Sequence, residues 1–144
     1  MITPLLELKQ AREELFAELR KEQCEDGFLE RHTAIVDHFF IRSVQESSTG
    51  RKLFSARKPF AFIALGGYGR GDLCLRSDID VMVLFPSSIP KEARDLTGEI
   101  LLPLWDLGME VGHCVRSLKD CTRLSLEDFE VFTSLLDARF LCGE

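Results

Sequence analysis

The sequence predicts an α/β (α+β) domain in which helices flank a small mixed sheet. Two short, almost wholly apolar segments, residues 60–65 and 79–85, have the composition of buried strands. A third strand is expected at about residues 109–116, and most other apolar residues recur at helical spacing. Helices combined with a few short strands are typical of this fold class. At 144 residues, 45% of them apolar, the chain is long enough for one domain with its own core.

Two helices are expected before the first strand. Thr3 and Pro4 have the character of an N-cap and a first helical residue, and leucines at helical spacing continue this helix to about residue 23. The polar residues 24–27 break it, and the polar residues 47–52 are expected to form a loop. Between these breaks lies a second helix, whose apolar face is formed by Phe28, Ile35, Val36, Phe39, Phe40 and Val44.

Further helices are expected on both sides of the third strand. Residues 91–107 precede it, and Pro103 should disturb the last turn of that helix. After the strand, residues 117–120 and 125–128 each resemble a capping box with aspartate in place of glutamate. The second box is expected to open a final helix whose inward residues are Phe129, Phe132, Leu135 and Leu136.

The domain organisation expected from these elements is simple. Residues 1–50 form an N-terminal helical segment that packs on a core of residues 51–144, and the two make one structural domain. The chain stops soon after the last expected helix without an evident cap, which indicates a fragment of a longer protein.

Composition excludes several functional classes. A net charge of −6 argues against nucleic acid as the main partner, and no apolar run approaches the roughly 20 residues of a membrane span. Five cysteines, without a CxxC pair, are expected as buried reduced thiols in a cytoplasmic protein. His113, Cys114 and Cys121 could suggest zinc, but a fourth ligand at suitable spacing is missing.

A glycine-rich turn, GGYGRGD at residues 66–72, connects the first two strands. Two familiar phosphate-binding motifs do not describe it. A Walker A loop requires a lysine that this turn lacks. A dinucleotide-binding fingerprint requires glycine where Asp72 stands, and the charge of Asp72 would repel a pyrophosphate.

The turn and the second strand together match a third pattern, the signature of the nucleotidyltransferases of the DNA polymerase beta superfamily. That signature joins an apolar residue and two small residues to a later acid–apolar–acid triplet. Here Gly66 and Gly67 are followed, after ten residues, by Asp78, Ile79 and Asp80. Each half alone would be weak evidence, whereas the combination is fairly specific.

The chemistry of the acid pair fits that signature. Side chains two residues apart on a strand point the same way, so Asp78 and Asp80 project together. Paired carboxylates suit the Mg²⁺ or Mn²⁺ ions that accompany a nucleoside triphosphate. The alternative is a solvated strand edge, or an ion pair with Arg70 or Arg76.

The turn itself can accept phosphate. Gly66 and Gly67 lack side chains, so phosphate oxygens can approach their backbone N–H groups, and Arg70 can meet the phosphate charge. The alternatives are a plain tight turn for the glycines and an ordinary surface charge for Arg70.

A third carboxylate is expected on the third strand. Glu110 is the candidate, either as a metal ligand or as the group that helps remove the proton from an acceptor hydroxyl. Asp106 is the second choice, near a helix end. His113 falls on the opposite face from Glu110 and is interpreted as structural, whereas Arg116 is in phase with Glu110 and could contact phosphate or form an ion pair.

Three runs of this sequence resemble the N-terminal nucleotidyltransferase domain of the bacterial bifunctional PII uridylyltransferase family. They are residues 64–80, 104–116 and 134–143. The resemblance implies a reaction: UMP passes from UTP to a tyrosine hydroxyl of the PII signal protein, with Mg²⁺ or Mn²⁺ and release of pyrophosphate.

The resemblance also assigns roles to residues. It implies Gly66 and Gly67 as the phosphate cradle, with Arg70 and Ser77 as further nucleotide-binding candidates. Asp78, Asp80 and Glu110 are the implied metal ligands and catalytic acids. Asp72 departs mildly from the family, which often has glutamate at that position.

The resemblance leaves alternatives open. The helical, HD-type and ACT regions of the full enzymes are not in this sequence, so we expect it neither to remove UMP nor to sense glutamine. A related transferase with another protein acceptor, such as the adenylyltransferase of glutamine synthetase, is one alternative. A non-catalytic regulatory domain of the same fold is another.

Overall fold

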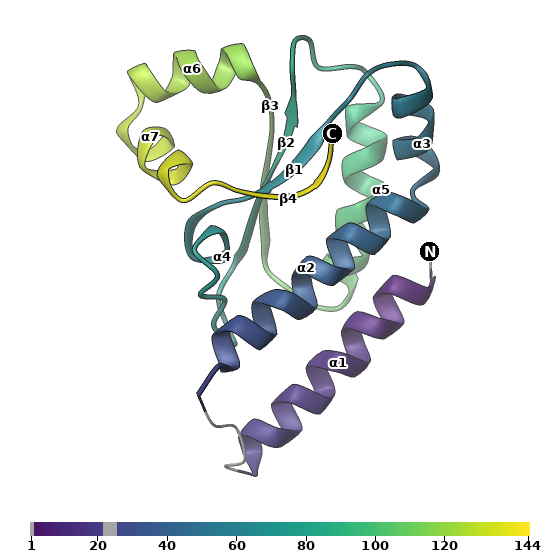
Figure 1. Ribbon diagram of the computed structural model, residues 1–144, viewed down its shortest axis with the longest axis vertical. Helices are drawn as coiled ribbons and strands as arrows, with labels where there is room; N and C mark the ends of the chain where they lie inside the picture. The colour runs from purple at the N-terminus through teal and green to yellow at the C-terminus, as the bar shows by residue number, and fades with distance from the viewer. Residues whose placement is uncertain (1, 22–25) are drawn as a thin grey trace.

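The computed structural model describes residues 2–21 and 26–144, and it shows a mixed sheet with helices on both sides (Figure 1). The predicted α/β (α+β) class is therefore confirmed. The predicted end of the first helix, at residue 23, lies outside the described residues. The helices are α1 (Ile2–Arg20), α2 (Phe28–Glu46), α3 (Ser48–Ser55), α4 (Gly66–Gly69), α5 (Ala93–Asp106), α6 (Leu118–Glu127) and α7 (Phe129–Leu136). The strands are β1 (Ala61–Ala64), β2 (Ile79–Phe85), β3 (Val111–Ser117) and β4 (Arg139–Gly143).

The sheet has the strand order β3-β2-β1-β4. β1 runs antiparallel to both β2 and β4, whereas β2 and β3 are parallel and are joined through α5. Ala64 faces Val81 in the first pairing, and Asp80 faces Gly112 in the parallel one. This register places the start of β2 between the end of β1 and the start of β3.

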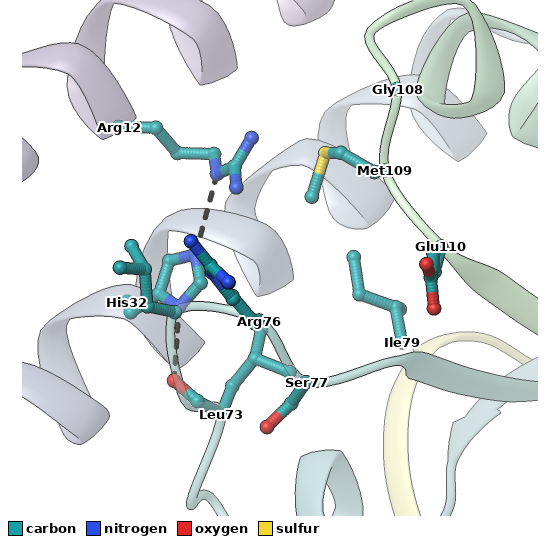
Figure 2. A pocket seen from close by; sticks show the side chains of 10 residues that line it. Arg12, His32, Leu73, Arg76, Ser77, Ile79, Gly108, Met109 and Glu110 are labelled. Atoms are coloured by element: carbon teal, nitrogen blue, oxygen red, sulfur yellow. Dashed lines mark hydrogen bonds between the residues drawn. The ribbon is translucent and has the colours of Figure 1, made fainter.

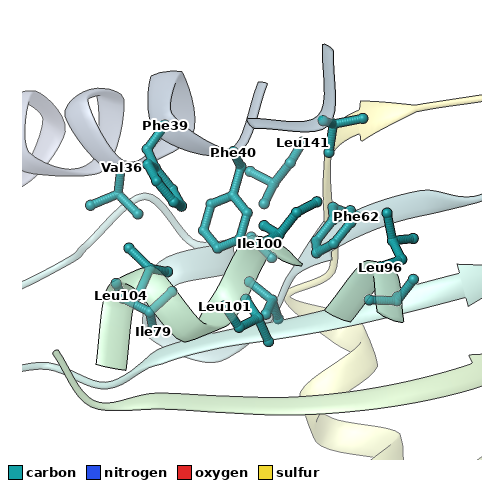
Figure 3. Packing of buried hydrophobic residues seen from close by; sticks show 14 of the residues in the cluster. Val36, Phe39, Phe40, Phe62, Ile79, Leu96, Ile100, Leu101, Leu104 and Leu141 are labelled. Carbon is teal, nitrogen blue, oxygen red and sulfur yellow. The ribbon is translucent and has the colours of Figure 1, made fainter. Parts of the chain in front are cut away.

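The main core lies between the sheet and the helices α2 and α5 (Figure 3). Phe40 of α2, Phe62 of β1 and Ile100 of α5 are fully buried there. A smaller apolar cluster covers the other face of the sheet, where Ile63 and Met82 meet Leu135 of α7. β1 is thus buried on both faces, as its uniformly apolar sequence predicted.

The predicted loop at residues 47–52 is wrong, because α3 begins there. Ser47 caps the helix, and its hydroxyl donates to the Glu99 carboxylate at 2.9 Å. The same carboxylate accepts the backbone N–H groups of Ser48 and Thr49, at 2.9 and 3.2 Å. These N–H groups of the first turn have no partner inside the helix, so a distant side chain on α5 stabilises it.

The segment after β3 also differs from the prediction, which had a single helix there. Ser117 and Asp120 do form a reciprocal capping box, and it opens α6. Ser125, however, lies inside α6, and its hydroxyl donates to the Thr122 carbonyl oxygen. The cap of α7 is Asp128, whose carboxylate accepts the N–H of Glu130 at 2.8 Å.

The final helix does not bury the face that its periodicity suggested. Leu135 packs on the sheet, but the side chains of Phe129, Phe132 and Leu136 are 78%, 45% and 70% exposed. Helical spacing reveals an apolar stripe but not what covers it. The strand β4, which follows α7 and pairs with β1, was not predicted.

The cysteines in the described part of the chain are free thiols. Cys74 is exposed, which corrects the expectation that they are buried, while Cys114, Cys121 and Cys142 are partly buried. Burial raises the pKa of Cys142 to about 12. No helix among the described residues is both long and apolar enough to cross a membrane.

Candidate active site

The glycine-rich turn and Asp80 are joined by the β1–β2 pairing. The N–H of Leu65, at the end of β1, donates to the carbonyl oxygen of Asp80 at 2.9 Å. The chain then enters the short helix α4 at Gly66, whose φ of 56° lies in the left-handed region that favours glycine. A Cβ on Gly66 would lie 3.5 Å from Oδ2 of Asp80, so the carboxylate stands directly beside the turn.

Asp78 and Asp80 flank Ile79 at the beginning of β2. Ile79 is buried in the main core, whereas Asp78 is exposed and Asp80 is partly buried on the other face. Burial, and to a lesser extent the charge of Asp78, raises the pKa of Asp80. The strand therefore holds two acids together that repel each other when both are ionised.

Glu110 joins the pair through the parallel pairing of β2 and β3. It stands immediately before β3 rather than within it, which corrects the expected strand start near residue 109. The N–H of Ile79 donates to its carbonyl oxygen at 2.9 Å. A hydrogen bond with Asp78, and then the Asp78 charge, raises the pKa of Glu110. Asp106, the second choice for a third acid, is the exposed last residue of α5.

Gly112 is a site residue that sequence reasoning missed. It faces Asp80 in the parallel pairing, and a Cβ on Gly112 would lie 2.5 Å from Oδ1 of Asp80. The absent side chain is what gives this carboxylate its space. The signal in the sequence is a glycine inside a predicted strand, which often marks a close approach by another group.

The three carboxylates have the right donor chemistry for a divalent cation. Oxygen-only ligands suit Mg²⁺ and Mn²⁺, and a cation would offset the charge of Asp78, which contributes to the raised pKa values of Asp80 and Glu110 after burial and hydrogen bonding respectively. Among the described residues, no three His, Cys, Asp or Glu side chains are gathered into a ready-made metal centre, and the suggested zinc site is not formed.

Arg70 and Ser77 are both engaged within the protein. Nη1 of Arg70 donates to Oδ2 of Asp137 at 2.6 Å, and another guanidinium nitrogen lies 3.6 Å from the position of a Cβ on Gly67. The Ser77 hydroxyl accepts the N–H of Cys74 at 3.1 Å. In the described part of the chain, neither Arg70 nor Arg76 forms an ion pair with Asp78 or Asp80.

Arg139 of β4 holds the glycine-rich turn in place, and sequence reasoning missed this role. Its guanidinium donates to both carboxylate oxygens of Asp37 on α2, at 2.7 and 3.1 Å. It also donates to the carbonyl oxygens of Tyr68 and Gly69, each at 3.1 Å. One side chain therefore ties the turn to a helix of the main core.

A hollow of about 260 Å³ opens beside Asp80, and Gly66, Gly112 and His113 are among its lining residues. His113 also makes an edge contact with the Trp105 ring, with the ring centroids 5.6 Å apart.

Nη1 of Arg116, the other strand residue considered for phosphate contact or an ion pair, is buried without a hydrogen-bond partner among the described residues.

Replacing Asp80 by asparagine is expected to stabilise the metal-free chain at neutral pH. Because folding raises the pKa of Asp80, the unfolded chain ionises first as the pH rises, and the free energy of unfolding falls between the ordinary and the raised pKa. Asp80→Asn removes this loss, so we expect a gain of about 0.5 kcal/mol above that window and none below it.

Urea unfolding at several pH values measures this difference, with EDTA present. Asp95→Asn, in the first turn of α5, is the matched control and should not gain stability. A variant at position 80 that is no more stable than the wild type at neutral pH would contradict the conclusion that folding raises the pKa of Asp80.

The fold and the arrangement of the turn and the acids define a class: this is a nucleotidyltransferase-like domain. Residues 10–108, more than half of the chain, match the family described as "Putative nucleotidyltransferase DUF294", and the chain belongs to this family. The matched range includes the glycine-rich turn and the Asp78–Asp80 pair and ends just before Glu110.

The chain is also similar to curated proteins, each named "Bifunctional uridylyltransferase/uridylyl-removing enzyme". It is 44% identical to the protein from Vibrio vulnificus (strain YJ016) over 62% of this chain, and 44% identical to that from Caulobacter vibrioides (strain NA1000 / CB15N) over 64%. It is 32% identical to the protein from Chromobacterium violaceum over 94% of this chain. The chain spans only 10–15% of the length of these relatives.

Proposed function

We propose that this domain transfers UMP from UTP to a tyrosine hydroxyl of a PII signal protein and releases pyrophosphate. The observation that carries the proposal is the position of Asp80 beside the glycine-rich turn, together with the influence of Asp78 on the pKa values of both Asp80 and Glu110. The names of the relatives support uridylyl transfer, and the acceptor follows from the sequence resemblance.

The turn is proposed to hold the phosphates of the nucleotide. The first N–H groups of a helical turn have no partner within it, and at Gly66 and Gly67 no side chain blocks their approach. Arg70 lies over Gly67 and keeps N–H donors beyond the one bound to Asp137. Ser77 stays a nucleotide-binding candidate at the end of the loop that leads into β2.

The acids are proposed to hold Mg²⁺ or Mn²⁺ through Asp78, Asp80 and Glu110. When bound, such an ion neutralises phosphate charge and orients the attacking oxygen. In the transfer, a bond forms between the tyrosine oxygen and the α-phosphorus, and the bond from that phosphorus to the α–β bridging oxygen breaks. The electron pair of the broken bond leaves with pyrophosphate. The hydroxyl proton passes to the exposed carboxylate of Glu110.

The proposal includes a cellular setting. The expected partners are a nucleoside triphosphate and the PII protein, not nucleic acid or a membrane, and the expected location is the cytoplasm. The free thiols of the described residues and the net charge of −6 are in keeping with this setting.

Calorimetric titration of UTP, ATP, GTP and CTP, with and without Mg²⁺, tests the proposal. We expect Mg²⁺-dependent binding that prefers UTP, and a loss of at least about a hundredfold in affinity in the Asp78→Asn/Asp80→Asn variant. Asp95→Asn, which removes an acid from α5, should bind as the wild type does.

Two results would contradict the proposal. Binding that survives in the double variant would mean that the acids do not hold the cation. A preference for ATP would favour the adenylyltransferase alternative. Pyrophosphate release would then be measured with PII and with glutamine synthetase as the acceptor, to show which of the two proteins is modified.

A further inference from the structure

A second hollow borders the loop that leads from the glycine-rich turn into β2, and Leu73 and Ser77 of that loop line it. It measures about 210 Å³ and is lined by Arg12, His32, Arg76, Met109 and Glu110, among others (Figure 2). It shares no lining residue with the hollow beside Asp80 and Gly66. Asp80 lines one of the two hollows and Glu110 lines the other.

Arg12 is fixed in this hollow by a chain of contacts. Nδ1 of the buried His32 hydrogen-bonds the Leu73 carbonyl oxygen at 2.9 Å, so this nitrogen carries the proton. Nε2 of the same ring then accepts the Nε–H of Arg12 at 3.3 Å. The guanidinium also lies over the Phe16 ring, 4.9 Å from its centroid. The Nη groups of Arg12 are left with no hydrogen bond to the described residues.

A second guanidinium, that of Arg76, enters the same hollow from the loop before β2. In the described part of the chain, neither Arg12 nor Arg76 forms an ion pair. Burial lowers the pKa of Arg12, which reflects the cost of an uncompensated charge there. Glu110 lies at the opposite end of the hollow from Arg12 and Arg76 (Figure 2). A bound anion would offset the positive charge of the two guanidinium groups.

The rest of the lining indicates what kind of anion fits. Leu75, Ile79 and Met109 give the hollow an apolar wall beside the two guanidinium groups. An aspartate or glutamate side chain has an apolar stem and a carboxylate that guanidinium groups bind well, whereas phosphate has no apolar part.

We infer that the Arg12–Arg76 hollow binds an acidic side chain of the acceptor polypeptide, next to the tyrosine that is modified. The inference rests on the proposed transferase function and adds a substrate preference to it. Because Glu110 lines the same hollow, an acceptor held here would place its tyrosine next to the acid that is proposed to accept the hydroxyl proton.

Nuclear magnetic resonance titration of the 144-residue chain tests the inference. The probes are acetyl-Glu-Tyr-amide, its neutral match acetyl-Gln-Tyr-amide, inorganic phosphate, and UTP with Mg²⁺. We expect the glutamyl peptide to shift the side-chain N–H signals of Arg12 and Arg76 and to bind about tenfold more tightly than the glutaminyl peptide. UTP with Mg²⁺ should instead shift the amides of Gly66 and Gly67.

Two variants sharpen the test. Arg76→Gln, at an exposed position, should lower the affinity for the glutamyl peptide about tenfold and leave the UTP response unchanged. Arg12→Gln should do the same if it folds. Arg94→Gln, an exposed arginine on α5, is the matched control and should change neither response.

The outcomes are separable. Equal affinity for the two peptides, or an undiminished response in Arg76→Gln, would overturn the inference. Shifts of Arg12 and Arg76 with phosphate or UTP as large as with the peptide would make the hollow a nucleotide subsite instead. A failure of UTP to move Gly66 and Gly67 would contradict the proposed function, and the peptide comparison would still decide the present inference.

Discussion

Gly112→Ala is expected to abolish most Mg²⁺-dependent UTP binding without unfolding the domain. The new methyl group would lie 2.5 Å from Oδ1 of Asp80, so the carboxylate must move out of its place between β3 and the glycine-rich turn. A ligand group misplaced by about 1 Å costs on the order of a hundredfold in such sites, and we expect a loss of that size. Stability should change little, because alanine restricts the unfolded chain more than glycine does.

The measurement is calorimetric titration of UTP with Mg²⁺, paired with urea unfolding of the same sample. Gly98→Ala is the matched control: on α5 its Cβ would meet only Leu102 Cδ1, at 3.7 Å. That control should bind UTP as the wild type does and gain up to about 1 kcal/mol in stability. If Gly112→Ala binds normally, the position of the Asp80 carboxylate is not what the site requires.

Arg139→Met is expected to have the largest effect on stability. It removes the two-pronged ion pair with Asp37 and the donors to the Tyr68 and Gly69 carbonyl oxygens, while methionine retains the apolar stem. Breaking a buried pair costs about 3–5 kcal/mol. Because the Arg139 and Asp37 side chains are 34% and 22% exposed, we expect about 2 kcal/mol. UTP affinity should also fall, since the turn loses its tie to α2.

Urea unfolding gives the stability change, and a double-mutant cycle with Asp37→Asn isolates the pair. The loss in the double variant should be smaller than the sum of the single losses by about 1 kcal/mol or more. Arg123→Met, which removes surface ion pairs with Asp120 and Glu127, is the control and should cost less than about 0.5 kcal/mol. An Arg139 variant as stable as this control would show that β4 does not hold the turn.

The two strands on either side of the glycine-rich turn were the most predictable elements, whereas the short helix α4 within the turn and the strand β4 were not predicted. β2 spans the same residues as predicted, and β1 lies within its predicted range, because an unbroken apolar run is a local signal for a strand buried on both faces. α3 was missed because its first N–H groups are satisfied by Glu99, about fifty positions away in the sequence. The apolar stripe of α7 was predicted correctly as helical and wrongly as buried, because periodicity does not show whether another element packs against the apolar face.

The sequence by itself determined the part of the site that is local in the chain. The spacing of Gly66, Gly67, Asp78 and Asp80 sets a turn between two strands and puts both acids on one side, since strand geometry repeats every two residues. Only the tertiary structure decided which residues stand around them. The register of β2 on β3 brings Gly112 against Asp80, and β4 brings Arg139 onto the turn. α1 places Arg12 near Arg76. These neighbours depend on long-range pairing and packing, which no local pattern in the chain encodes.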